Sequence, residues 1–112
     1  MIGKELTAEE CLQLDELKNA ILELANIRSF KELDGREEQK VIFKGLYCYY
    51  AREIGATLPS IGKAINIKHP TVVYHWKCHE DKNRFHPLYR YTNSLLEQLC
   101  RNKGYSFIDF KK

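Results

Sequence analysis

Basic and small polar side chains gather around a proline in the second half of the chain. Lys68, His69, Pro70 and Thr71 follow one another, and further lysines and a histidine stand on either side. A threonine hydroxyl and a histidine nitrogen can hydrogen-bond to the edges of bases, and lysine ammonium groups bind phosphate oxygens. These residue types predict contact with a polyanion rather than covalent chemistry. The candidate contact residues are Lys44, Lys63, Lys68, His69, Pro70, Thr71, His75 and Lys77.

The elements that would position these residues are a short helix, a tight turn and a longer helix. Thr57 predicts an N-cap, with Pro59 in the first turn of the short helix. The segment 66–68 breaks the apolar pattern, and His69-Pro70 begins a helix that we expect to end near residues 81–84. This arrangement predicts a helix-turn-helix, whose second helix would enter the major groove of DNA. We expect its inward-facing residues to be Ile61, Ala64, Ile65, Val72, Val73 and Trp76.

Three further helices are predicted around this pair. Thr7 and Glu10 have the spacing of a capping box, and an apolar stripe of helical period continues from Thr7 to Arg28. A second helix is expected over residues 36–54, capped by Asp34 with Glu37, and its Gly45 suggests a close helix crossing. A last helix is expected over residues 87–103. The fold class is therefore all-α, with four to five helices around a helix-turn-helix.

The expected organisation has three parts. Residues 1–35 form an acidic N-terminal helix and its connection, residues 36–104 form the helix-turn-helix domain, and residues 105–112 form a short tail. Within this tail, residues 105–110 alternate apolar with polar side chains, which is typical of a short strand or of an extended segment lying on the helices.

The net charge of +3 conceals a segregation along the chain. Residues 1–39 carry five basic and ten acidic side chains, whereas residues 40–90 carry nine basic and three acidic ones. An acidic first third and a basic middle predict a polyanionic partner for the middle alone.

Several classes of protein are disfavoured by the sequence. No segment has the apolar length of a membrane span, and the N-terminus lacks the apolar stretch of a signal peptide, so we expect a cytoplasmic protein without a membrane partner. Four scattered cysteines predict reduced, mostly buried thiols. His75, Cys78 and His79 have a spacing that can hold a metal, but no second ligand pair stands nearby, and we expect no metal site.

The segment from Val41 to Lys82 resembles the C-terminal DNA-binding domain of the bacterial replication initiator DnaA. Tyr49-Tyr50-Ala51-Arg52-Glu53 is similar to the family's Tyr-Leu-x-Lys/Arg-Glu, and Leu58-Pro59-Ser60-Ile61-Gly62 matches its Leu-Pro-x-Ile-Gly. His69-Pro70-Thr71-Val72 stands where the family has His-Thr-Thr-Val, preceded there by Arg-Asp. The match covers a little over a third of the chain, and its weight comes from the order and spacing of the three pieces.

The sequence also departs from the family pattern. The turn before His69 is one residue shorter, the Arg-Asp pair is absent, and Pro70 replaces the first threonine. The resemblance implies base contacts for His69 and Thr71, with Lys68 as a basic stand-in for the absent pair. It further implies that Lys44 reaches DNA from the preceding long helix.

These features together predict sequence-selective binding of double-stranded DNA, serving origin recognition, transcriptional regulation or a mobile element. No Gly-x-x-x-x-Gly-Lys-Ser/Thr loop is present, so we expect neither ATPase activity nor a cofactor, and the protein is not expected to be an enzyme. The alternative is a protein-interaction module on a helix-turn-helix scaffold that no longer binds DNA. In either case the helix from Thr7 to Arg28 is a candidate surface for a homodimer or a protein partner.

Overall fold

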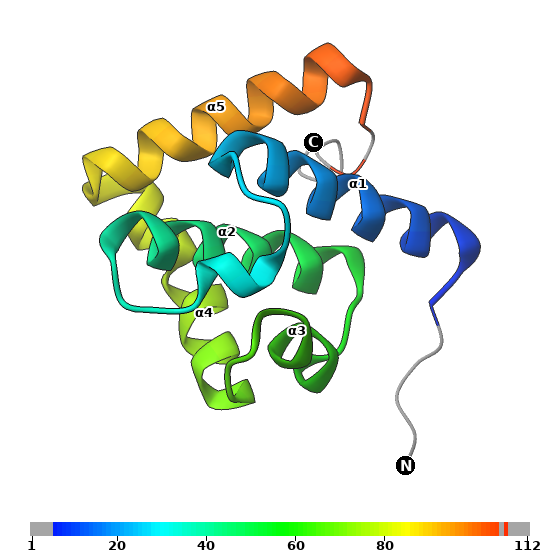
Figure 1. Ribbon diagram of the computed structural model, residues 1–112, viewed down its shortest axis with the longest axis horizontal. Helices are drawn as coiled ribbons and strands as arrows, with labels where there is room; N and C mark the ends of the chain where they lie inside the picture. The colour runs from blue at the N-terminus through cyan, green and yellow to red at the C-terminus, as the bar shows by residue number, and fades with distance from the viewer. Residues whose placement is uncertain (1–5, 106, 108–112) are drawn as a thin grey trace.

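Helical periodicity and helix caps give the described part of this chain five α-helices and one short 3-10 helix. The computed structural model describes residues 6–105 and 107, and no strand occurs among them, which confirms the all-α prediction. Figure 1 shows α1 and α5 on one side of α2, and α3 with the start of α4 on the other. The elements are α1 Ala8–Ala25, η1 Phe30–Leu33, α2 Glu38–Ile54, α3 Leu58–Ile65, α4 His69–Phe85 and α5 Pro87–Lys103.

The first helix begins at the predicted capping box. The hydroxyl of Thr7 accepts from the Glu10 amide at 3.1 Å, and the Glu10 carboxylate accepts from the Thr7 amide at 2.9 Å. Leu17 and Ile21 are fully buried on the inner face, where α1 packs against α2 and α5. The acidic N-terminal segment therefore contributes to the same hydrophobic core as the helix-turn-helix.

The second helix is the centre of the molecule, and it contacts every other helix. It begins at Glu38, two residues later than predicted, and the predicted cap is wrong because Glu37 occupies the N-cap without a side-chain hydrogen bond. Gly45 marks a close crossing, as predicted. A β-carbon there would lie 3.4 Å from both His75 Nδ1 and a ring carbon of Tyr89, so α4 and α5 approach α2 at this glycine.

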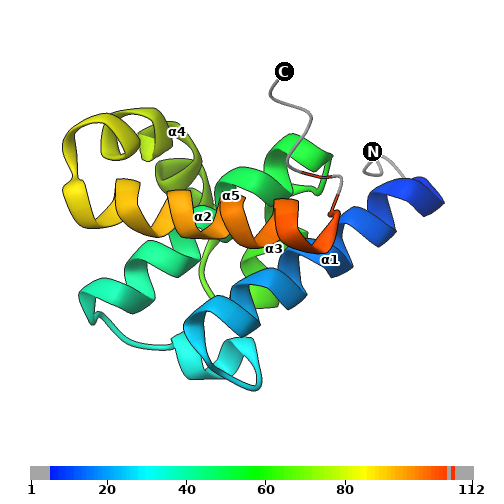
Figure 2. The same ribbon diagram turned by 90° about the horizontal axis from the view of Figure 1, so that it is seen from above.

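The helix-turn-helix prediction matches α3, the turn at residues 66–68 and α4. Ile61, Ile65 and Val72 are buried as expected, but Ala64 is exposed, which corrects its predicted inward position. The fourth helix continues to Phe85, beyond the predicted end. Figure 2 shows α4 and α5 meeting at one end of the molecule, where the chain reverses.

The fifth helix has the predicted bounds, with an unpredicted cap. His86 Nδ1 accepts from the Tyr89 amide at 3.2 Å, so this histidine begins the helix that follows it. Most of the tail prediction for residues 105–110 lies outside the described residues. Phe107 is described, and its buried ring packs edge-on against Tyr50 with centroids 5.7 Å apart.

Two further sequence predictions can be compared with the described residues. All four thiols are free, and two of them, Cys48 and Cys100, are buried. None of the described helices combines the length and apolar character needed to cross a bilayer.

Candidate nucleic-acid interface

The turn between α3 and α4 is tight because Gly62 has no side chain. The amide of Ile67 donates to the Gly62 carbonyl at 2.8 Å, and Asn66 adopts a left-handed conformation with φ 58°. A β-carbon on Gly62 would stand 2.4 Å from the Ile67 carbonyl oxygen. The close return of the chain sets where α4 begins and which face of it is exposed.

Side chains from the end of α2 hold α4 in place. Trp76 donates from its indole nitrogen to the Glu53 carboxylate at 3.1 Å, and the Arg52 guanidinium lies 5.4 Å from the Trp76 ring centroid. Arg52 also donates to the carbonyl of Ala56 at 3.2 Å, just before α3. This cluster ties α2, α4 and the loop into α3 together.

A buried aromatic group fixes the next turns of α4. The His79 ring stacks on Tyr49 of α2 with centroids 3.6 Å apart, and His79 Nδ1 lies 2.6 Å from the Tyr89 hydroxyl of α5. Because α4 is held on two sides, its remaining face is rigidly presented to solvent.

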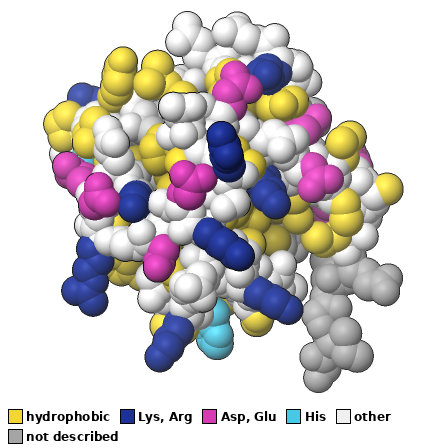
Figure 3. Space-filling view, in the orientation of Figure 1, with side chains coloured by type: hydrophobic (Ala, Val, Ile, Leu, Met, Phe, Trp, Pro, Cys, Tyr) yellow, Lys and Arg dark blue, Asp and Glu magenta, His cyan; other side chains and the backbone are white. Residues whose placement is uncertain are grey.

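Six of the eight predicted contact residues are exposed. They occupy the end of α3, the turn, and the start and middle of α4, and Figure 3 shows Lys, Arg and His side chains at this lower end of the molecule. No described residue forms an ion pair with Lys63, Lys68 or Lys77. The surface thus carries positive charge that the fold does not neutralise. The six residues are Lys63, Lys68, His69, Pro70, Thr71 and Lys77.

Lys44 does not belong to this exposed group, which corrects the sequence prediction. Its side chain is only 8% exposed, and its ammonium donates to the Gly35 carbonyl at 2.8 Å. The lysine lies on a helix that is buried for most of its length, and it closes the loop before that helix. It is not presented to a ligand outside the molecule.

His75 is the second correction. It is 6% exposed, and its buried Nδ1 has no hydrogen-bond partner among the described residues. Burial, together with the smaller effect of the positive charges of Lys82 and Lys44, lowers the pKa of His75 to about 4. The ring is therefore neutral at pH 7 and supplies no charge for a phosphate.

Tyr74 is an exposed residue of α4 that the sequence prediction did not include among the contact residues. It is 55% exposed and follows Thr71 by three positions, which places both on one face of α4. The Lys82 ammonium lies 5.5 Å from its ring centroid. The helical spacing from Thr71 was the available signal, but the sequence prediction placed the neighbouring His75 at the interface instead.

The residues of the candidate metal motif lie on α4 as well. No group of three or more potential metal ligands from His, Cys, Asp and Glu occurs in the described part of the chain. His79 is instead engaged with the rings of Tyr49 and Tyr89.

Comparison with protein-family models, with curated proteins and with solved structures gives no match for this chain.

Proposed function

We propose that this protein binds double-stranded DNA with sequence selectivity, by placing the first turns of α4 in the major groove. In this proposal Thr71 and His69 contact base edges, Tyr74 extends the contact along the groove, and lysines beside them bind phosphates.

The observation that carries the proposal is the exposed, unpaired positive surface around the start of α4. Lys63 comes from α3, Lys68 from the turn and Lys77 from the middle of α4, so the charges flank Thr71 on both sides. Lysines in such positions would orient the helix on the phosphate backbone, and the small side chain of Thr71 can approach a base edge without a clash.

The likeness of residues 41–82 to the DNA-binding domain of DnaA supports the same function. It extends the proposal to origin recognition, transcriptional regulation or the DNA transactions of a mobile element. We infer that the protein acts by binding, without ATPase activity, since the sequence lacks the phosphate-binding loop of such enzymes.

A second candidate is a protein-interaction module that retains the scaffold but not DNA binding. The inward position of Lys44 favours it, because the resemblance assigns this residue to DNA, whereas here its ammonium bonds a backbone carbonyl. Selection from random duplexes, followed by binding measurements on the selected duplex, separates the two. Retention at low salt that falls steeply with added salt supports DNA binding. If the protein binds no duplex even at low salt, that result supports the protein-interaction module.

Two substitutions and a control test the assigned roles by fluorescence anisotropy. Thr71→Ala should reduce the preference for the selected duplex over an unrelated one by roughly tenfold. Lys63→Ala should weaken binding to both duplexes and reduce the salt slope by about one. Lys103→Ala is the matched control, because this lysine is the last residue of α5 and pairs with Glu23 of α1 at 2.8 Å. Figure 1 shows α1 and α5 on the other side of α2 from α3 and the start of α4. Equal, sequence-independent losses from Thr71→Ala and Lys63→Ala would contradict base reading by α4.

A further inference from the structure

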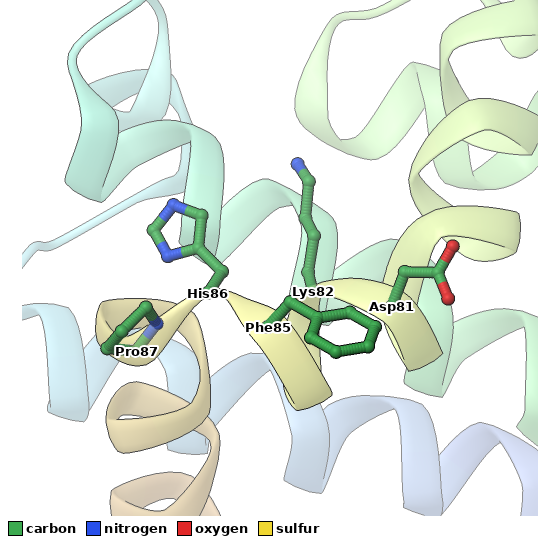
Figure 4. A pocket seen from close by; sticks show the side chains of 5 residues that line it. All are labelled: Asp81, Lys82, Phe85, His86 and Pro87. Atoms are coloured by element: carbon green, nitrogen blue, oxygen red, sulfur yellow. The ribbon is translucent and has the colours of Figure 1, made fainter.

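An apolar projection stands where α4 ends and α5 begins. Phe85 is 74% exposed, the highest fraction among the exposed large apolar side chains of the described chain. Beside it lies a shallow hollow of about 440 Å³ lined by Asp81, Lys82, Phe85, His86 and Pro87 (Figure 4). A protruding ring and a hollow therefore lie on the same small surface.

Charged side chains of opposite sign accompany this ring. Asp81 and Arg84 are both exposed, and neither forms an ion pair with a described residue. On α4, Asp81 comes three positions before Arg84 and four positions before Phe85. The Arg84 guanidinium lies 5.8 Å from the Phe85 ring centroid. We call Asp81, Arg84, Phe85 and Pro87 the α4–α5 tip.

We propose that the α4–α5 tip is the docking surface for a second copy of this chain. A two-fold axis through the contact would bring two α4 ends together in opposite directions, so that Asp81 of each copy faces Arg84 of the other. Each Phe85 ring would enter the hollow beside the opposing ring. Each pairing would occur twice, once on each side of the two-fold axis, as an isologous dimer requires.

The first helix is less suited to this role than its sequence suggested. Leu17, Ala20 and Ile21 of its apolar stripe are buried within the chain's own core. Leu12, at 57% exposure, is the α1 member of the exposed large apolar group. Its substitution therefore provides a control of similar chemistry at a distant surface.

Sedimentation velocity of the full chain without DNA tests the proposal. The wild type should show a concentration-dependent monomer–dimer equilibrium. Phe85→Ser should raise the dissociation constant at least about tenfold, whereas Leu12→Ser should leave it unchanged. Circular dichroism checks that both variants keep the wild-type helix content, which their exposed positions allow. A chain that stays monomeric up to about 1 mM, or a dimer disrupted by Leu12→Ser and not by Phe85→Ser, would overturn the proposal.

Charge reversal then tests the pairing itself. Asp81→Arg and Arg84→Asp should each weaken the dimer several-fold, because each places like charges opposite one another. The double variant restores opposite charges across the two-fold axis and should recover most of the affinity. Two single effects that simply add in the double variant would contradict the Asp81–Arg84 pairing.

Discussion

Two polar side chains in the basic part of the sequence serve the interior of the fold. The Lys44 ammonium reaches the Gly35 carbonyl at 2.8 Å and so fastens the loop before α2 to the helix. A hydrogen bond from a charged donor of this kind contributes about 1.5–3 kcal/mol. The His75 ring of α4 lies against Gly45 of α2, where burial and then the charges of Lys82 and Lys44 oppose its protonation. Lys44, Lys82 and His75 therefore influence one another within the fold and affect its stability. They do not form a common binding site for a ligand.

The buried His75 should make the fold sensitive to acid. Its pKa is lowered from 6.5 to about 4, so the unfolded chain binds the proton more tightly than the folded one. The stability present above pH 6.5 should fall as the pH drops towards 4, by about 2–3 kcal/mol at this site. Urea unfolding of wild type and His75→Gln at about pH 7.5 and 4.5 measures this effect. The variant should lose less stability on acidification, and an identical loss in both proteins would remove His75 as the cause.

At the level of elements, the turn between α3 and α4 depends on the absence of a side chain at one position. Gly62→Ala would place a β-carbon 2.4 Å from the Ile67 carbonyl oxygen, a backbone atom that cannot move without displacing α4. We expect a loss of about 2 kcal/mol or more in the free energy of unfolding. Gly45→Ala is the matched control, because its β-carbon would meet only side-chain atoms at 3.4 Å and the helix would gain intrinsic propensity.

Urea unfolding monitored by circular dichroism measures both glycine variants. Gly45→Ala should change stability by less than about 1 kcal/mol in either direction, and DNA binding should suffer only in Gly62→Ala. If Gly45→Ala were the more damaging substitution, the helix crossing rather than the turn would be the tightest point of the fold.

Local signals in the sequence were sufficient to predict most elements but not which faces they bury. Signals at helix starts act within a few residues, so the helices that they begin were predicted close to their observed bounds. These signals are the capping box at Thr7, the N-cap at Thr57 and the prolines at positions 70 and 87. Gly45 indicated a close crossing, but no local pattern shows that His75 of α4 and Tyr89 of α5 are the residues that meet α2 there. The inward position of Lys44 likewise depends on its bond to the Gly35 carbonyl, nine residues away. For the same reason the prediction placed Ala64 on the buried face of α3, whereas it is exposed.

Across the whole molecule, the acidic and basic parts of the chain share one core. Leu17 and Ile21 of α1 belong to the same buried cluster as Leu46 of α2 and Val72 of α4. The segregation of charge therefore describes the surface, since both parts of the chain contribute to one buried cluster. An acidic α1 on the opposite side of α2 from a basic α3–α4 end would orient the molecule in the field of a polyanion.

A single substitution in α1 should therefore lower the stability of the helix-turn-helix. Leu17→Ala removes a fully buried side chain and should cost about 2–5 kcal/mol. Trp76, the one tryptophan of the chain, lies between α4 and α2 and reports on that region by fluorescence. In Leu17→Ala the unfolding midpoint measured by Trp76 fluorescence should fall by the same amount as the midpoint measured by circular dichroism. An unchanged Trp76 transition would mean that α1 is an appendage to an independent domain.

The two proposals combine into a prediction about the DNA site, which rests on both. From Pro70 to Phe85, α4 rises about 22 Å, so two copies joined at their α4–α5 tips would hold the starts of their α4 helices at most about 45 Å apart. Inclining the two helices brings this separation to the roughly 34 Å between successive major grooves on one side of the duplex. Selected duplexes should thus contain inverted half-sites one helical turn apart. Phe85→Ser should bind such a duplex no better than a single half-site, while Leu12→Ser keeps the wild-type preference. If the wild type selected single, non-repeated sites, the prediction would fail, because DNA binding would then not depend on association through the α4–α5 tip.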